Sequence, residues 1–483
     1  MKRTISISFL SLLFVFIACK KDFMNIVPLD AVPENSFWKT KEDIDGAVNG
    51  IYSEFLSAVM GGTASTAALP TNDFYANEIQ DMWDLITLKF TANNGQIYWI
   101  WSTCYTSIAR TNRVIARTPK MPINADYKAI KLAEAKCIRG YFYYTLIAAY
   151  GGVPLILDEQ TATSDPNPIR APIADVLRAM IKDFTEAAAD LPAKWDDNNV
   201  GRVTKGTALT LLGLTNLYLE DWNASIKCFE DLEALGTYKL LPNYMDQFKY
   251  SQENTQESIL ECQFSDTPES NNYWQSFFGP RDAGDAGATS ATWGIFFPTQ
   301  KLLKSLEPGD DRRKQFLTPG EKITLPASNF VYTMQGEGKS AKTDVVLTKF
   351  WVGHPASNNL SGQNILMLKY SSAIMYYAEA LAHAGRFADA YAQINRIRTR
   401  AKLPNKAVVN DLETCITDIN KERRIENCFE VNGFWYDLTR TKQAKKFLKE
   451  QYNIEMDDYK YLFPIPQSQL DLDKNLEQNP GYN

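Results

Sequence analysis

Residues 368–400 read LKYSSAIMYYAEALAHAGRFADAYAQINRIRTR, and this stretch decides the fold. Its first half has apolar residues at helical spacing, namely Ile374, Tyr377, Ala378 and Leu381. After Gly385 a second apolar series follows, namely Phe387, Tyr391, Ile394 and Ile397. Residues three, four and seven positions apart lie on one face of an α-helix, so each half predicts an amphipathic helix. With the glycine between them, the two halves predict an antiparallel helical hairpin.

The hairpin resembles the tetratricopeptide (TPR) unit, and similar patterns occur upstream. Residues 208–235 repeat the helix–turn–helix pattern, and residues 134–149 predict a long apolar helix that ends before Gly151. A single hairpin cannot bury both of its faces, so we expect these segments to pack together. Trp222 and Phe387 follow the turns of two hairpins at matching positions, and we expect both to be buried. The alternative is an unrelated helical protein with generic amphipathic helices.

The N-terminus has the features of a bacterial targeting segment. Residues 5–17 form an apolar run after a basic start, and this run is too short to cross a bilayer as a helix. Residues 16–19 read FIAC and resemble the lipobox of bacterial lipoproteins, in which the cysteine is acylated. We therefore expect a signal peptide at 1–18, a lipid anchor at Cys19 and a tether at 19–35. The alternative is ordinary cleavage beside an incidental cysteine.

Charge and motifs argue against a nucleic-acid partner and against an enzyme. The net charge is −6, and no long basic block occurs. The two histidines, His354 and His383, belong to no metal-binding or catalytic motif. Glu422 and Glu426 stand beside two arginines and predict a structural ion network. A glycoside hydrolase would need two carboxylates facing across a cleft, which sequence spacing leaves open. We predict no catalytic residue, no metal site and no cofactor.

Short motifs along the whole chain resemble the SusD/RagB family of Bacteroidetes surface lipoproteins. After Cys19 they are DF, FW, AVNG, YGGVPL, GRVTK, ERRIE, FPIP and QNPGY, at residues 22–23, 37–38, 47–50, 150–155, 201–205, 422–426, 463–466 and 478–482. Their number and order carry the resemblance. It implies a mainly all-α fold, in which a TPR-like scaffold of four helix pairs stands beside an irregular, loop-rich subdomain.

The loop-rich region is expected between residues 263 and 366, where helical spacing fades and glycine and proline turn signals crowd together. Within it the sequence predicts only a short helix at Pro298–Leu306 and a strand at Val345–Trp351. The expected division is therefore an N-terminal region with hairpins at 36–262, ligand-facing loops at 263–366, and the last hairpin with the C-terminal region at 367–483.

The resemblance also implies a function. It predicts a lipid-anchored protein on the cell surface of the outer membrane, which binds an oligosaccharide and delivers it to a SusC-like TonB-dependent transporter. A RagB-like protein that binds peptide is the alternative within the family. Outside it, the alternatives are a TPR-type protein-interaction module without a small ligand and a glycoside hydrolase.

Aromatic residues in polar loops are the candidate ligand-binding groups. Tryptophan faces suit sugars because one side of a pyranose ring is apolar, and covering about 100 Å² contributes roughly 2.5 kcal/mol. We expect three distant loops to bring their tryptophans to one face above the helices. The candidate residues are Trp83, Trp274, Trp293, Asn72, Asp73, Tyr273 and Arg281. The alternative for each tryptophan is a place in the core.

Overall fold

We analysed a computed structural model of the chain. It describes residues 37–482 except 77–78, 268–269, 281–282, 284–291, 326–328, 330, 335–344, 352–360 and 432. The expected signal peptide, the anchor Cys19, the tether up to residue 35 and the candidate Arg281 lie outside the described residues.

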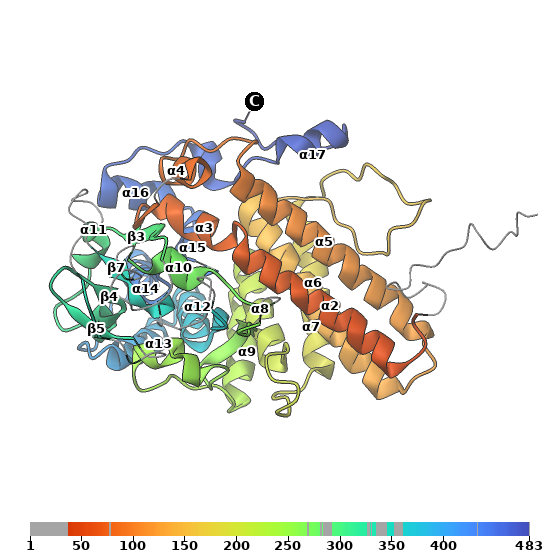
Figure 1. Cartoon of the computed structure of the whole chain (residues 1–483), viewed down its shortest axis with the longest axis horizontal. Coiled ribbons are helices and arrows are strands. Elements are labelled where there is room, and N and C mark those ends of the chain that lie inside the picture. Colours follow the sequence, from red (N-terminus) through yellow and green to blue (C-terminus); the bar gives the residue numbers. More distant parts are fainter. Residues whose placement is uncertain are drawn as a thin grey trace, which may run out of the picture.

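Long helices form the scaffold of the molecule (Figure 1). They are α2 (Lys41–Met60), α5 (Gly95–Arg117), α6 (Ala125–Tyr150), α7 (Ile173–Asp190), α8 (Lys205–Tyr218), α9 (Trp222–Ala234), α12 (Tyr370–His383), α13 (Phe387–Arg400) and α14 (Leu412–Glu426). In the described part of the chain eight of them pack as four pairs, α2 with α5, α6 with α7, α8 with α9, and α12 with α13, and α14 packs against α12 and α13. The predicted all-α scaffold of helical hairpins is confirmed.

The hairpin that opened the sequence analysis consists of α12 and α13. Gly385 lies between the two helices with a φ of 74°, a left-handed conformation that costs glycine little. Trp222 and Phe387 are the first residues of α9 and α13, so they do occupy matching positions. Both side chains are only half-buried against the core, because the first residue of a second helix lies at the solvent-facing end of its hairpin. Both therefore pack against the core as expected, but neither is fully buried.

Short elements surround the scaffold. The helices are α3 (Thr63–Ala68), α4 (Gln80–Ile86), α10 (Trp274–Phe278), α11 (Gln300–Leu303), α15 (Phe434–Arg440), α16 (Ala444–Tyr452) and α17 (Gln467–Leu472). The strands are β1 (Phe74–Ala76), β2 (Ser258–Cys262), β3 (Phe296–Pro298), β4 (Phe316–Leu317), β5 (Lys322–Thr324), β6 (Val331–Thr333), β7 (Val346–Leu347) and β8 (Ile365–Lys369). They form antiparallel pairs, β1 with β3, β2 with β8, β4 with β7, and β5 with β6.

The short elements between β2 and β8 agree only in part with the sequence. The predicted helix at 298–306 is present as the single turn α11. The predicted strand at 345–351 is the two-residue β7, which continues into a 3₁₀ turn at Thr348–Phe350. The sequence did not predict α10, and this helix turns out to position the candidate site.

Buried ion pairs tie α14 to the elements around it. Glu422 accepts hydrogen bonds from Arg312 at 2.7 Å and from Arg398 at 2.6 Å, and all three side chains are buried. Glu426 pairs with Arg400. Burial alone would raise the pKa of Glu426, but Arg400 and neighbouring cations lower it to about 2. The predicted structural ion network is confirmed, although the adjacent Arg423 and Arg424 pair with Glu379 and Asp73 instead.

Among the residues that the structure describes, none of the helices combines the length and the apolar character that a membrane crossing requires.

Candidate functional site: an exposed aromatic surface

Three aromatic side chains gather at the outer face of α10. The rings of Tyr273 and Trp293 stack with centroids 5.3 Å apart and an interplanar angle of 24°. Phe277 lies 5.5 Å from Trp293, again between ring centroids. The backbone N–H of Trp293 donates to the carbonyl of Ser276 at 2.7 Å, which attaches the Trp293 loop to α10. Tyr273 and Trp293 remain 39% and 38% exposed.

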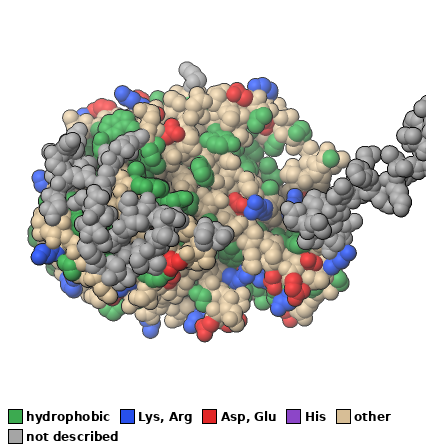
Figure 2. Space-filling model, in the orientation of Figure 1, with side chains coloured by type: hydrophobic (Ala, Val, Ile, Leu, Met, Phe, Trp, Pro, Cys, Tyr) green, Lys and Arg blue, Asp and Glu red, His purple; other side chains and the backbone are tan. Residues whose placement is uncertain are grey.

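A second aromatic pair lies on neighbouring elements. Trp83 of α4 is 39% exposed, and its ring meets Tyr75 of β1 edge to face at 5.4 Å. Tyr75 is paired in register with Phe297 of β3, and β3 begins shortly after Trp293. The β1–β3 ladder therefore joins the two groups. We call Tyr75, Trp83, Tyr273, Phe277 and Trp293 the aromatic surface. Figure 1 shows α4, β3 and α10 on one side of the molecule, and Figure 2 shows hydrophobic side chains gathered over this area.

Trp274 does not belong to this surface. It is 3% exposed, and its ring packs edge to face against Phe350 at 4.6 Å. The expectation that it would be exposed is wrong, and α10 supplies the reason. Residues four apart share a helix face, so Trp274 and Phe278 point into the core while Tyr273 and Phe277 point outward.

Asn72 and Asp73 lie beneath the aromatic surface and hold the backbone in place. Asn72 adopts a left-handed conformation with a φ of 61°, and its amide donates to the carbonyl of Ile86 at 2.9 Å. Asp73 is 3% exposed, and its carboxylate accepts hydrogen bonds from Arg424 and Tyr452, each at 2.5 Å. With its carboxylate occupied in this way, Asp73 presents no free acceptor at the surface. The prediction of Asp73 as a ligand-facing group is therefore corrected.

Sequence reasoning overlooked two members of the aromatic surface, Tyr75 and Phe277. Phe277 could have been found from its four-residue spacing to Tyr273. Tyr75 could have been found from its alternation with the buried Phe74 and Ala76. In chemical terms the surface offers stacking faces. Among the described residues, no group of three or more His, Cys, Asp or Glu side chains is arranged to hold a metal ion.

Comparison with known proteins identifies the family. A family described as "SusD family" matches residues 328–482, and a second, described as "Starch-binding associating with outer membrane", matches residues 22–219. The chain belongs to the SusD/RagB family. The predicted family is thus confirmed, and the second description associates that group of proteins with the outer membrane.

Relatives of this SusD/RagB protein match it over most of its length. It is 24% identical to SusD-like protein P38 of Formosa agariphila over 99% of both chains. It is 25% identical to a SusD-like protein of Bacteroides ovatus, over 88% of this chain and 80% of the relative.

Solved structures share the fold. A SusD-like protein from Bacteroides fragilis superposes with a TM-score of 0.82 at 22% identity, covering 94% of this chain and 100% of the other. A protein titled "Laminarin binding SusD-like protein" superposes with a TM-score of 0.78 at 24% identity, covering 92% and 100%. The surface glycan-binding protein A from Bacteroides uniformis gives a TM-score of 0.76 at 20% identity, covering 91% and 99%.

Proposed function

We propose that this chain is a glycan-binding protein that holds an oligosaccharide on the aromatic surface. The observation that carries the proposal is the pair of exposed stacked rings, Tyr273 and Trp293, with exposed Trp83 on the adjoining element. Two structural relatives support it, because one is titled as laminarin-binding and the other as a surface glycan-binding protein.

Stacking is the physical basis of the binding. The axial C–H side of a pyranose ring is apolar, and burying about 100 Å² of it on an indole contributes roughly 2.5 kcal/mol. Trp83 and Trp293 provide two such faces. After the cost of immobilising the sugar, we expect dissociation constants in the mM to μM range. Binding of this strength allows rapid release of the ligand.

Capture and transfer complete the proposal. Acylation at Cys19 would attach the protein to the outer membrane at the cell surface, and a SusC-like TonB-dependent transporter would receive the glycan. The family description that names the outer membrane supports this location. The protein carries out no chemical step in this scheme, so it releases the same oligosaccharide that it bound.

Calorimetry with a panel of oligosaccharides, laminarin oligosaccharides included, tests the site. We expect Trp293→Ala and Trp83→Ala each to weaken binding by roughly 2 kcal/mol, about thirtyfold, because each removes one stacking face. Trp99→Ala is the matched control, since Trp99 is 48% exposed but lies on α5, where its indole N–H donates to the carbonyl of Ser57. If Trp293→Ala and Trp83→Ala both bind the glycan as well as the wild-type protein and Trp99→Ala do, the aromatic surface is not the binding site.

A further inference from the structure

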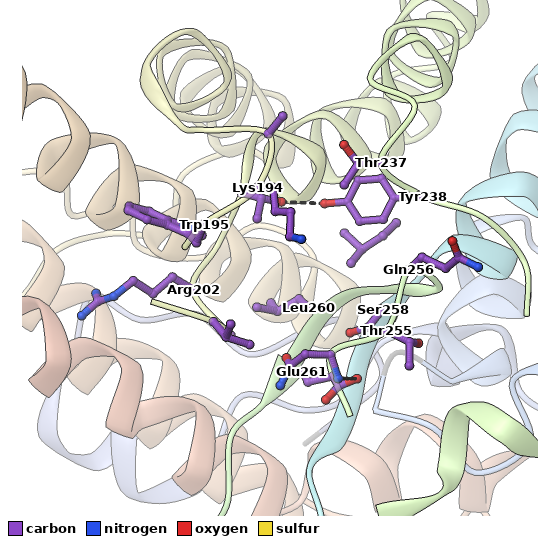
Figure 3. Close-up of a pocket in the computed structure, with 16 residues that line it drawn as sticks. Lys194, Trp195, Arg202, Thr237, Tyr238, Thr255, Gln256, Ser258, Leu260 and Glu261 are labelled. Atoms are coloured by element: carbon purple, nitrogen blue, oxygen red, sulfur yellow. Dashed lines mark hydrogen bonds between the residues drawn. The ribbon is translucent and has the colours of Figure 1, made fainter. Parts of the chain in front are cut away.

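A separate cavity of about 340 Å³ lies on the scaffold, among residues that the proposed glycan site does not use. Three segments line it, namely the loop between α7 and α8 (193–204), the residues after α9 (237–238) and the chain entering β2 (254–261). Figure 3 shows their side chains converging on one space. A single hexose residue fits within a space of this size.

The walls of this cavity are fixed before any ligand arrives. The hydroxyls of Tyr238 and Thr204 share a hydrogen bond of 2.7 Å, which is drawn in Figure 3. The indole N–H of Trp195 donates to the carbonyl of Val203 at 2.8 Å. Glu261 accepts hydrogen bonds from the backbone N–H of Asn254 at 2.9 Å and from the amide of Asn364 at 3.0 Å. A preformed pocket loses little conformational entropy on binding.

Two cations line the cavity, and only Lys194 is available to a ligand. The Arg202 guanidinium is engaged elsewhere, by Glu134 at 2.8 Å, Asn49 at 2.6 Å and Asn199 at 3.0 Å. Figure 3 shows the Lys194 side chain pointing into the cavity toward Leu260 and the Tyr238 ring. Within the described part of the chain, no hydrogen bond or ion pair engages the Lys194 ammonium.

The lining as a whole suits a sugar. It combines hydroxyl and amide groups with an apolar floor, and the polar members are Thr204, Thr237, Thr255, Ser258, Tyr238, Asn254 and Gln256. Leu260 and Val200 supply apolar surface for the C–H side of a pyranose ring. Lys194 is exposed, and a ligand that fills the cavity displaces water from its ammonium. An opposite charge on the ligand replaces that water with a stronger hydrogen bond than a neutral hydroxyl does.

The carboxylate of Glu261 also lines this space, where amide groups hold it in place. Both of its oxygens already accept hydrogen bonds from amide groups. Burial raises the pKa of Glu261, and hydrogen bonds from Asn364, Ser258 and Asn254 oppose that rise.

We propose that this cavity is a second binding site, specific for a single acidic sugar residue. The sugar carboxylate would pair with Lys194, its hydroxyls would bond to the threonine, serine and amide groups, and its apolar face would lie on Leu260 and Val200. The site is independent of the aromatic surface and extends the range of sugars that the protein binds.

Calorimetric and NMR titrations of the full chain with methyl β-D-glucuronide test the assignment, with methyl β-D-glucoside as the neutral comparison. We expect saturable binding of one glucuronide per chain, at least several-fold tighter than the glucoside and weaker at high salt. Lys194→Met should remove that preference, whereas Lys194→Arg should keep it. Val200→Trp should abolish binding by filling the cavity, and its exposed position allows the variant to fold.

Absence of glucuronide binding, equal affinity for the two sugars, or unchanged binding in Val200→Trp would each overturn the proposal. Trp293→Ala distinguishes this site from the proposed glycan site, because it should leave glucuronide binding intact while it weakens binding of neutral oligosaccharides. Conversely, Val200→Trp should leave the binding of neutral oligosaccharides unchanged.

Discussion

At the scale of single residues, the pair of Asp73 and Arg424 joins distant parts of the chain beneath the aromatic surface. Removing one partner of a buried pair leaves an uncompensated charge, so we expect Asp73→Ala to lower the free energy of unfolding by about 3–5 kcal/mol. Denaturant unfolding measures this. Asp458→Ala is the control, because Asp458 forms only an exposed pair with Lys445 and its loss should cost less than about 1 kcal/mol. Equal stability of the two variants would contradict a buried structural role for Asp73.

The exposure of single tryptophans shows what the local sequence does not predict. Trp83 and Trp293 were expected at the surface and are partly exposed there, whereas Trp274 is buried. Asn271 and Asn272 come just before Trp274, and two asparagines in a row suggest a surface loop. The decisive property is which face of α10 a side chain occupies. A five-residue helix is too short to produce a recognisable periodic pattern.

At the scale of elements, Trp222 of α9 stacks on His383 of α12 and connects two hairpins. Their ring centroids lie 4.1 Å apart with an interplanar angle of 8°. Burial lowers the pKa of His383. Glu379 of the same helix and Glu220 raise it, and Arg440 and Arg423 lower it. The unfolded chain therefore binds a proton at this histidine more readily than the folded protein does. Stability is lost as the pH falls through the unfolded pKa of about 6.5 toward the lower folded value.

His383→Gln tests this linkage. The variant lacks the titrating ring. Between pH 8 and pH 5.5 its melting temperature should therefore fall less than that of the wild type, and the two falls should differ by about 1–2 °C. Carboxylates contribute to the acid sensitivity of both proteins, so the difference between the two is the measurement. Identical pH profiles would show that His383 titrates alike in the folded and unfolded states.

The elements differ in how far sequence predicts them. The hairpins α8–α9 and α12–α13 repeat apolar residues over several turns, so local periodicity is enough to locate them. The β1–β3 ladder pairs Tyr75 with Phe297, far along the chain, and two three-residue strands show no pattern of their own. The scaffold was therefore predictable from the sequence. The arrangement that brings Trp83 toward Trp293 depends on long-range pairing, which the sequence pattern does not encode.

At the scale of the whole molecule, one scaffold carries both of the binding sites that we propose. The aromatic surface lies on short elements supported by α14 through the pair of Asp73 and Arg424. The cavity around Lys194 lies between α7, α8 and β2. Because the scaffold helices connect the two, a lipid anchor at Cys19 would hold both surfaces near the membrane at once.

Cys19→Ala tests that anchor by cell fractionation. Acyl chains contribute about 0.8 kcal/mol per buried CH₂, so we expect loss of the modified cysteine to move the protein out of the outer-membrane fraction, as a soluble form or an inner-membrane precursor. Lys21→Ala, which keeps the cysteine, should stay in place.

A partner transporter could also retain Cys19→Ala at the membrane, so the measurement is made in cells with and without that transporter. Retention only in its presence would show that the partner holds the protein. Firm retention in its absence would show that Cys19 is not the anchor.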